Sequence, residues 1–189
     1  RFMKKVLVLM ATYNGARYLD EQIQSLIDQK NVELEILVRD DGSTDNTINV
    51  LNKWKKQGKL DWYTGKHLNV QYGFYDLMEH AAQKDTEYIA FCDQDDVWLA
   101  DKISMAQKAM RDTSVPELYI ADYYLTDGEL NIIEECAFPK EKKHTLLQIL
   151  FANVSPGCAM AFNKALLQEM RRVLPEDVPM HDLYALAVA

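Results

Sequence analysis

The chain has 189 residues, enough for one large domain or two small ones with a substantial buried core. Its 21 basic and 29 acidic side chains give a formal net charge of −8, which argues against a nucleic-acid backbone as the ligand. Apolar residues make up 48% and charged residues 26%, as in ordinary globular domains, and no apolar run approaches the roughly 20 residues that span a bilayer.

The three cysteines and four histidines show no spacing typical of a zinc site. An odd number of widely spaced cysteines without a CxxC pair is typical of reduced thiols in a cytoplasmic protein. The apolar run over residues 6–11 is too short for the hydrophobic region of a signal peptide. We therefore expect a cytoplasmic protein without disulfides or zinc.

Strand-like and helix-like segments alternate along the first two thirds of the chain. Val6–Met10 is continuously apolar, the pattern of a strand buried on both faces. A helical period of apolar residues follows, and after the next strand Ser43 or Thr44 can cap a second helix. The pattern predicts strands over 6–10, 34–38, 60–63, 88–92 and 118–125, and helices over 19–27, 48–54, 74–82 and 99–110.

The last third of the chain is less regular. Asp127-Gly128 is a turn signal, and we expect helices over 145–152, 164–173 and 183–189 with a short strand over 159–162. Because 183–189 is apolar and helical, we also expect a C-terminal truncation. Alternating strands and helices predict an α/β fold with a largely parallel central sheet and helices on both faces.

A run of acidic residues, Asp93–Asp96, follows the predicted strand over 88–92. Packing several carboxylates together is unfavourable unless a cation neutralises them. Carboxylate oxygens are ligands of hard divalent cations, so the run predicts a Mn²⁺ or Mg²⁺ site, although a solvated acidic turn would explain the same residues.

Two further strand ends are polar, Thr12–Gly15 and Asp40–Ser43. In a parallel sheet such ends lie at one edge, where ligands of open α/β sheets bind. The chain lacks both a GxxxxGK[ST] loop and a GxGxxG turn, so a diphosphate would bind through the divalent cation.

Three segments resemble the family 2 glycosyltransferases of the GT-A fold, namely Ala11–Gly15, Asp40–Asp45, and Asp93–Asp96 with Trp98. The resemblance is closest to bacterial rhamnosyltransferase-like members, in which DQDDxW and a later HD pair, here His181-Asp182, recur. It implies one GT-A catalytic domain over 1–189, with a nucleotide-sugar-binding half (1–125) and an acceptor-side half (126–189).

The resemblance also implies a role for each donor-site residue. Thr12, Tyr13 and Asn14 would line the nucleotide pocket, and a core-facing ring is the structural alternative for Tyr13. Asp41, with Asp40 as its competitor, would bond the base or ribose, while helix capping would be their structural alternative. Asp95 would hold the metal, Asp93 would face the ribose or the metal, and we expect Asp96 to be structural.

The acceptor side is assigned in the same way. Asp182 would be the catalytic base and His181 would orient it, unless the pair merely caps a helix. Gly157 would border the donor sugar and acceptor, unless it merely forms a turn, and Trp98 would border the acceptor or pack beneath the acidic run. The aromatic pair common after HD is replaced by Leu183-Tyr184, which leaves the acceptor contacts open.

The function implied is metal-dependent, inverting transfer of a sugar from a nucleotide diphosphate to a glycan or lipid-linked saccharide. The first expectation for the donor is dTDP-rhamnose, with a UDP-hexose and a catalytically silent sugar-nucleotide-binding module as alternatives. A lipid-linked acceptor would bring the protein to the inner face of the membrane as a peripheral contact. A phosphoacceptor signalling domain is disfavoured, because no lone aspartate follows the third predicted strand.

Overall fold

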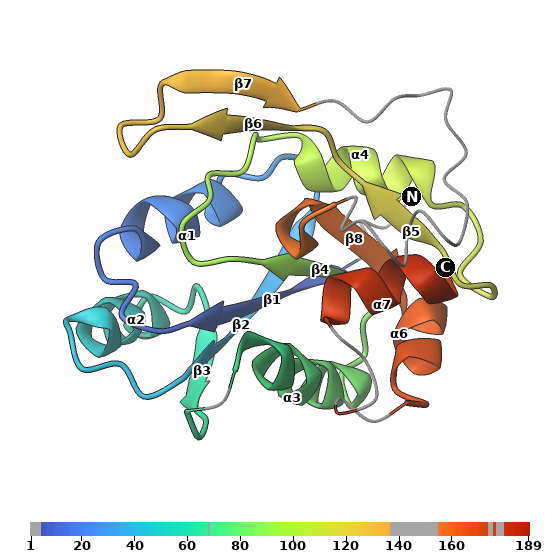
Figure 1. Ribbon diagram of the computed structural model, residues 1–189, viewed down its shortest axis with the longest axis horizontal. Helices are drawn as coiled ribbons and strands as arrows, with labels where there is room; N and C mark the ends of the chain where they lie inside the picture. Colours follow the sequence, from blue (N-terminus) through green and yellow to red (C-terminus); the bar gives the residue numbers. More distant parts are fainter. Residues whose placement is uncertain (1–4, 68, 137–154, 174–175, 177–179) are drawn as a thin grey trace.

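The computed structural model describes residues 5–67, 69–136, 155–173, 176 and 180–189. A six-stranded sheet with the order β3-β2-β1-β4-β8-β5 forms its centre (Figure 1). The strands of this sheet are β1 (Lys5–Thr12), β2 (Glu33–Asp40), β3 (Asp61–Thr64), β4 (Tyr88–Cys92), β5 (Leu118–Ile120) and β8 (Met160–Asn163). A separate two-stranded sheet pairs β6 (Tyr123–Thr126) with β7 (Ile132–Cys136).

The central sheet is largely parallel, as the sequence predicts. β1 pairs in parallel with β2 and β4, and β2 pairs in parallel with β3, whereas β8 runs antiparallel to both β4 and β5. In this register Thr12 lies opposite Asp40, and Met10 lies opposite Cys92. The C-terminal ends of β1, β2 and β4 therefore meet at one edge of the sheet.

Helices cover both faces of the sheet, which confirms the predicted layers (Figure 1). Alternate residues of β1 divide between two core clusters, so that Val6 and Val8 pack on one face while Leu7 and Leu9 pack on the other. This division is why the strand reads as a continuous apolar run. The helices are α1 (Leu19–Ile27), α2 (Thr47–Lys56), α3 (Val70–Ala82), α4 (Lys102–Ala109), α6 (Lys164–Met170) and α7 (His181–Val188), with a 3-10 turn, η1, at Gly157–Ala159.

The single strand predicted over 118–125 is wrong. β5 stays in the central sheet, and after Ala121, whose amide donates to the Ala159 carbonyl at 2.9 Å, the chain leaves that sheet to pair as β6. The predicted turn at Asp127 is present, because its carboxylate accepts from the amides of Glu129 and Asn131 at 2.9 and 3.0 Å.

The predicted cap of the second helix is also wrong. α2 begins at Thr47, three residues after Thr44, and the Thr47 amide donates to Asp45 Oδ1 at 2.9 Å. Ser43 is engaged elsewhere, as described below. The helix predicted over 145–152 lies outside the described residues. None of the helices in the described ranges is long and apolar enough to cross a membrane.

Candidate active site

The loops that follow β1, β2 and β4 are joined to one another by hydrogen bonds. The Asp41 amide donates to the Thr12 carbonyl at 2.9 Å, and the Asn14 amide donates to Ser43 Oγ at 2.8 Å. The Tyr13 amide donates to the side-chain carbonyl of Gln94 at 3.0 Å. The three polar strand ends that the sequence places at one edge therefore form one continuous surface.

Gln94, for which the sequence analysis assigned no role, connects the first loop to the acidic run. Its Oε1 accepts from Thr12 Oγ1 at 2.7 Å as well as from the Tyr13 amide. A Cβ on Gly15 would lie only 2.4 Å from the same oxygen, so this contact requires glycine there. The only sequence signal for Gln94 was its place inside the acidic motif.

The two aspartates after β2 have different surroundings. Asp40 is fully buried, and its carboxylate accepts from the amides of Gly42 and Ser43 at 3.0 Å and from Ser43 Oγ. These bonds fold the loop back on itself. Asp41 is 7% exposed and pairs with Arg39 through one carboxylate oxygen. Both carboxylate oxygens of Asp40 are therefore bonded within the loop, whereas Oδ2 of Asp41 takes no part in these loop bonds.

Asn14 joins the first and second loops. Its backbone is left-handed, with φ of 50°, and its side-chain oxygen accepts from the Thr44 amide at 2.8 Å. Asparagine tolerates this conformation better than most residues. Asn14, which the sequence predicts to line the nucleotide site, therefore sets the conformation of the first loop and joins it to the second.

Tyr13 points outward, since 44% of it is exposed, and the core-facing alternative is excluded. Its ring lies 4.6 Å from the ring of His67, at an interplanar angle of 48°. His67 Nδ1 is 3.0 Å from the Asp41 carbonyl oxygen. Two aromatic rings and the backbone of Asp41 thus lie together, and no motif in the sequence marks His67.

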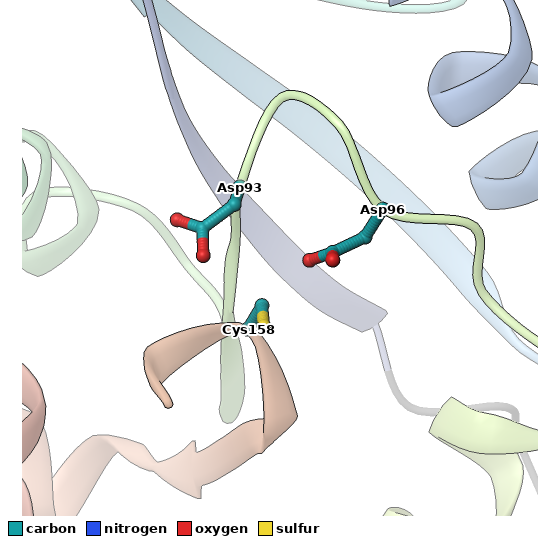
Figure 2. Close-up of side chains that lie close together, drawn as sticks. All are labelled: Asp93, Asp96 and Cys158. Carbon is teal, nitrogen blue, oxygen red and sulfur yellow. The ribbon is translucent and has the colours of Figure 1, made fainter. Parts of the chain in front are cut away.

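Asp93 and Asp96 form a compact cluster with Cys158, which comes from the 3-10 turn η1 (Figure 2). One ligand atom from each of the three side chains lies within 4.8 Å of the others. Burial and then the neighbouring Asp96 raise the pKa of Asp93 to about 6. Burial likewise raises the pKa of Asp96, which the sequence analysis expected to be structural.

Asp95, the predicted metal ligand, is not a member of this cluster. It is exposed, and it lines a pocket of about 200 Å³ to which Tyr18 and Thr126 also contribute. The structure therefore brings Asp93 together with Asp96 and Cys158 rather than with Asp95.

The cluster fits a hard divalent cation. Two carboxylates supply the oxygen ligands that Mn²⁺ and Mg²⁺ take, and the buried Oδ2 atom of Asp96 has no hydrogen-bond partner in the described part of the chain. Burial raises the pKa of the Cys158 thiol, and a hard cation prefers carboxylate oxygens to a thiol sulfur. The two aspartates would hold the metal and the thiol would border it.

A positive charge lies directly beneath the acidic loop. Lys102 Nζ donates to the Cys158 carbonyl and lies 3.8 Å from the centre of the Trp98 ring. Trp98 is 5% exposed, so the structure places it as packing beneath the loop. Burial lowers the pKa of Lys102, while the nearby Asp96 and Asp93 oppose that shift.

His181 and Asp182 begin α7 and are 3% and 4% exposed. The His181 ring stacks on Phe74 with centroids 4.0 Å apart and meets Phe91 edge-on at 4.8 Å. Burial among these rings lowers the pKa of His181, so the imidazole is neutral at pH 7. Neither ring nitrogen has a hydrogen-bond partner among the described residues.

Gly157 allows the turn η1 to pack closely against His181 and Asp182 at the start of α7. A Cβ at this position would lie 2.8 Å from His181 Nε2 and 3.6 Å from Asp182 Cβ. The next residue, Cys158, belongs to the acidic cluster, and the charge of Asp182 contributes to the raised pKa of Asp93. Asp182 is therefore close to the predicted diphosphate side of the site, although it lies far along the chain.

Comparison with known proteins identifies the family of this chain. The family described as "Glycosyl transferase family 2" matches residues 7–169. The dTDP-rhamnosyl transferase RfbG of Shigella flexneri is 29% identical over 196 residues, which cover 95% of this chain and 64% of RfbG.

Two solved structures share the fold. TarS of S. aureus in complex with UDP superposes with a TM-score of 0.72 at 22% identity, covering 97% of this chain and 55% of that chain. The mannosyltransferase PcManGT from Pyrobaculum calidifontis, in complex with GDP-Man and Mn²⁺, gives a TM-score of 0.68 at 19% identity over 97% of this chain and 51% of that chain. This chain thus spans less than two thirds of each of the three proteins. It belongs to glycosyl transferase family 2 and has the GT-A type of fold.

Proposed function

We propose that this chain is the catalytic domain of a metal-dependent, inverting glycosyltransferase that uses a nucleotide diphosphate sugar. The observation that carries the proposal is the meeting, at one sheet edge, of the paired Tyr13 and His67 rings, a half-buried pair of aspartates and the distant Asp182. These are the parts needed to bind a base, to hold a diphosphate and to activate an acceptor hydroxyl.

The nucleotide would bind across the loops after β1 and β2. The exposed Tyr13 ring offers a stacking face, and Asp41 has an oxygen that can accept from the base or the ribose. Thr12 and Asn14 fix the positions of these groups through their bonds to Gln94 and Thr44.

The diphosphate would lie over the acidic cluster. Asp93 and Asp96 would hold Mn²⁺ or Mg²⁺, with the exposed Asp95 able to reach the same cation from the solvent side. When bound, such a cation neutralises the charge that develops on the leaving diphosphate. The raised pKa of Asp93 means that cation binding also displaces a proton below about pH 6.

Asp182 would act as the general base. Its carboxylate takes the proton from the acceptor hydroxyl as the oxygen attacks the anomeric carbon from the side opposite the diphosphate, which inverts that carbon. His181, neutral, stacked on Phe74 and edge-on to Phe91, would hold the start of α7 in place. Gly157 permits its backbone to lie close to His181 and Asp182, and we expect it to border the donor sugar there.

The donor that we favour is dTDP-rhamnose, because the relative that covers 95% of this chain is a dTDP-rhamnosyl transferase. A UDP-hexose is the alternative, which the UDP complex of TarS supports at the level of the fold. The acceptor would be a glycan or a lipid-linked saccharide of a surface polysaccharide, and a lipid-linked acceptor would require peripheral membrane contact.

The experiment measures binding and transfer separately in the wild type and in Asp182→Asn. We expect dTDP-rhamnose or a UDP-sugar to raise the melting temperature in the presence of Mn²⁺, and Asp182→Asn to abolish transfer while keeping that shift. Loss of binding in Asp182→Asn would make Asp182 structural. Binding without transfer in the wild type, across acceptors, would identify a silent binding module instead.

A further inference from the structure

Arg39 is a fully buried arginine that neither the motifs nor the proposed chemistry explains. It lies on β2 immediately before the two aspartates and is 1% exposed. A buried guanidinium is unfavourable unless its N–H groups find hydrogen-bond acceptors or a carboxylate. Its contacts therefore indicate what this residue holds in place.

The guanidinium reaches three separate segments. Nε donates to Asp76 Oδ2 on α3 at 2.8 Å, Nη2 donates to the Lys66 carbonyl after β3 at 2.9 Å, and Nη1 pairs with Asp41 Oδ1. Asp76 is fixed in turn by the Tyr63 hydroxyl, which donates to the same oxygen at 2.7 Å. The planar fork thus has one donor direction for each segment.

Two glycines make room for this arrangement. A Cβ on Gly65 would lie 2.3 Å from the guanidinium carbon of Arg39, and a Cβ on Gly73 would lie 3.2 Å from Nη1. The Gly65 amide also donates to the Asp40 carbonyl at 2.8 Å, which ties the loop after β3 to β2. The flat guanidinium of Arg39 can therefore lie close to the backbone of Gly65 and Gly73, because neither residue has a side chain.

Two of the three segments that Arg39 holds carry groups of the predicted base site. The ion pair occupies Asp41 Oδ1 and so sets the direction of the other carboxylate oxygen. Lys66 directly precedes His67, whose ring packs against Tyr13 and whose Nδ1 lies 3.0 Å from the Asp41 carbonyl. Because Arg39 holds the Lys66 carbonyl, it also fixes the position of the His67 ring beside Tyr13.

We propose that Arg39 is a positioning residue for nucleotide recognition, which orients Asp41 and holds the His67 loop so that both face the base of the donor. The inference rests on the proposed function, because it assumes that a nucleotide binds here. Arg39 acts through Asp41 and His67 and does not itself touch the nucleotide.

The test compares a ligand that has a base with one that has none. Calorimetry with Mn²⁺ measures the affinity of UDP, of dTDP and of inorganic pyrophosphate for the wild type, Arg39→Met, Arg39→Lys and Asp41→Asn. We expect Arg39→Met to weaken UDP and dTDP by about 10- to 100-fold, the range for losing a residue that supports a ligand-binding group. Pyrophosphate affinity should stay at the wild-type value, and Arg39→Lys should recover part of the loss by keeping the charge.

The double variant separates positioning from general stability. If Arg39 acts through Asp41, then Arg39→Met combined with Asp41→Asn weakens UDP no more than the stronger single variant. Arg171→Met is the matched control, because Arg171 also pairs with an α3 carboxylate, Glu79 at 2.7 Å, and lies outside the predicted base pocket. It should leave the UDP affinity unchanged.

Several results would overturn the inference. Equal losses for UDP and pyrophosphate, additive losses in the double variant, or unchanged UDP affinity in Arg39→Met each would do so. If Arg39→Met does not fold, Arg39→Lys and Asp76→Asn, which loosens the Nε contact at a half-exposed position, are judged by the same criteria. A wild type that binds neither UDP nor dTDP overturns the proposed function itself, which distinguishes the two failures.

Discussion

Replacing Gly157 by alanine tests whether the proposed catalytic role of Asp182 depends on the close contact between Gly157 and His181. The added Cβ would lie 2.8 Å from His181 Nε2, whereas ordinary contacts begin near 3.4 Å, so His181 would have to move by about 0.6 Å. Overpacking of this kind costs about 1–3 kcal/mol of stability. In a domain of this size each kcal/mol lowers the melting temperature by roughly 2–4 °C, so we expect a fall of roughly 2–12 °C.

The same displacement should slow sugar transfer. A shift of about 1 Å in a catalytic group lowers the rate by about 100-fold, so a shift of this smaller size should lower kcat by about 10-fold or more. Affinity for UDP or dTDP should stay unchanged, because Tyr13 and Asp41 lie on other loops.

The assay is the initial transfer rate at saturating donor, with nucleotide affinity measured by calorimetry and the melting temperature by scanning calorimetry. Gly128→Ala is the matched control, since a Cβ there would lie at an ordinary 3.5 Å from Arg17 Nη2. A Gly157→Ala protein that melts lower yet retains the wild-type kcat would refute the reasoning, because the pair would have moved without consequence for the reaction.

Asp96→Asn should weaken Mn²⁺ binding more than Asp95→Asn, because of these two residues Asp96 lies with Asp93 in the half-buried cluster; equal effects in metal titration would contradict this. Gln94→Ala should weaken UDP or dTDP by about 10-fold, since Thr12 Oγ1 and the Tyr13 amide lose their acceptor. His181 binds its proton less readily when folded, so the free energy of unfolding should fall below about pH 6.5, by up to about 1.4 kcal/mol per pH unit. His181→Phe should reduce that slope in urea unfolding at pH 5 to 7.5, and an unchanged slope would show that another group is responsible.

The parts of the fold that the sequence predicts well are those with a strong local pattern. The apolar run of β1 is buried on both faces, so its character does not depend on distant partners. The convergence of three strand ends follows from parallel pairing alone. The break between β5 and β6 has no such signal: neither Gly nor Pro stands at Ala121-Asp122, and the strand changes sheets because of its partners.

Within the site, side-chain direction was the information that the sequence lacked. Asp95 and Asp96 are neighbours in one loop, and only the path of the backbone decides which of them joins Asp93. Cys158 enters the cluster through a contact between residues distant in the chain, which no local pattern reveals. Arg39 ends an apolar run and reads as the end of a strand, yet it is fully buried because three segments supply its partners.

Calorimetric titration of dTDP and UDP, with Mn²⁺ and then with a chelator in its place, tests the claim that this sheet edge binds a nucleotide diphosphate through a metal held by aspartates. We expect one of the two nucleotides to bind with Mn²⁺ and to lose most of its affinity with the chelator or in Asp93→Asn. Binding of equal strength without the metal, or no binding of either nucleotide, would contradict the claim.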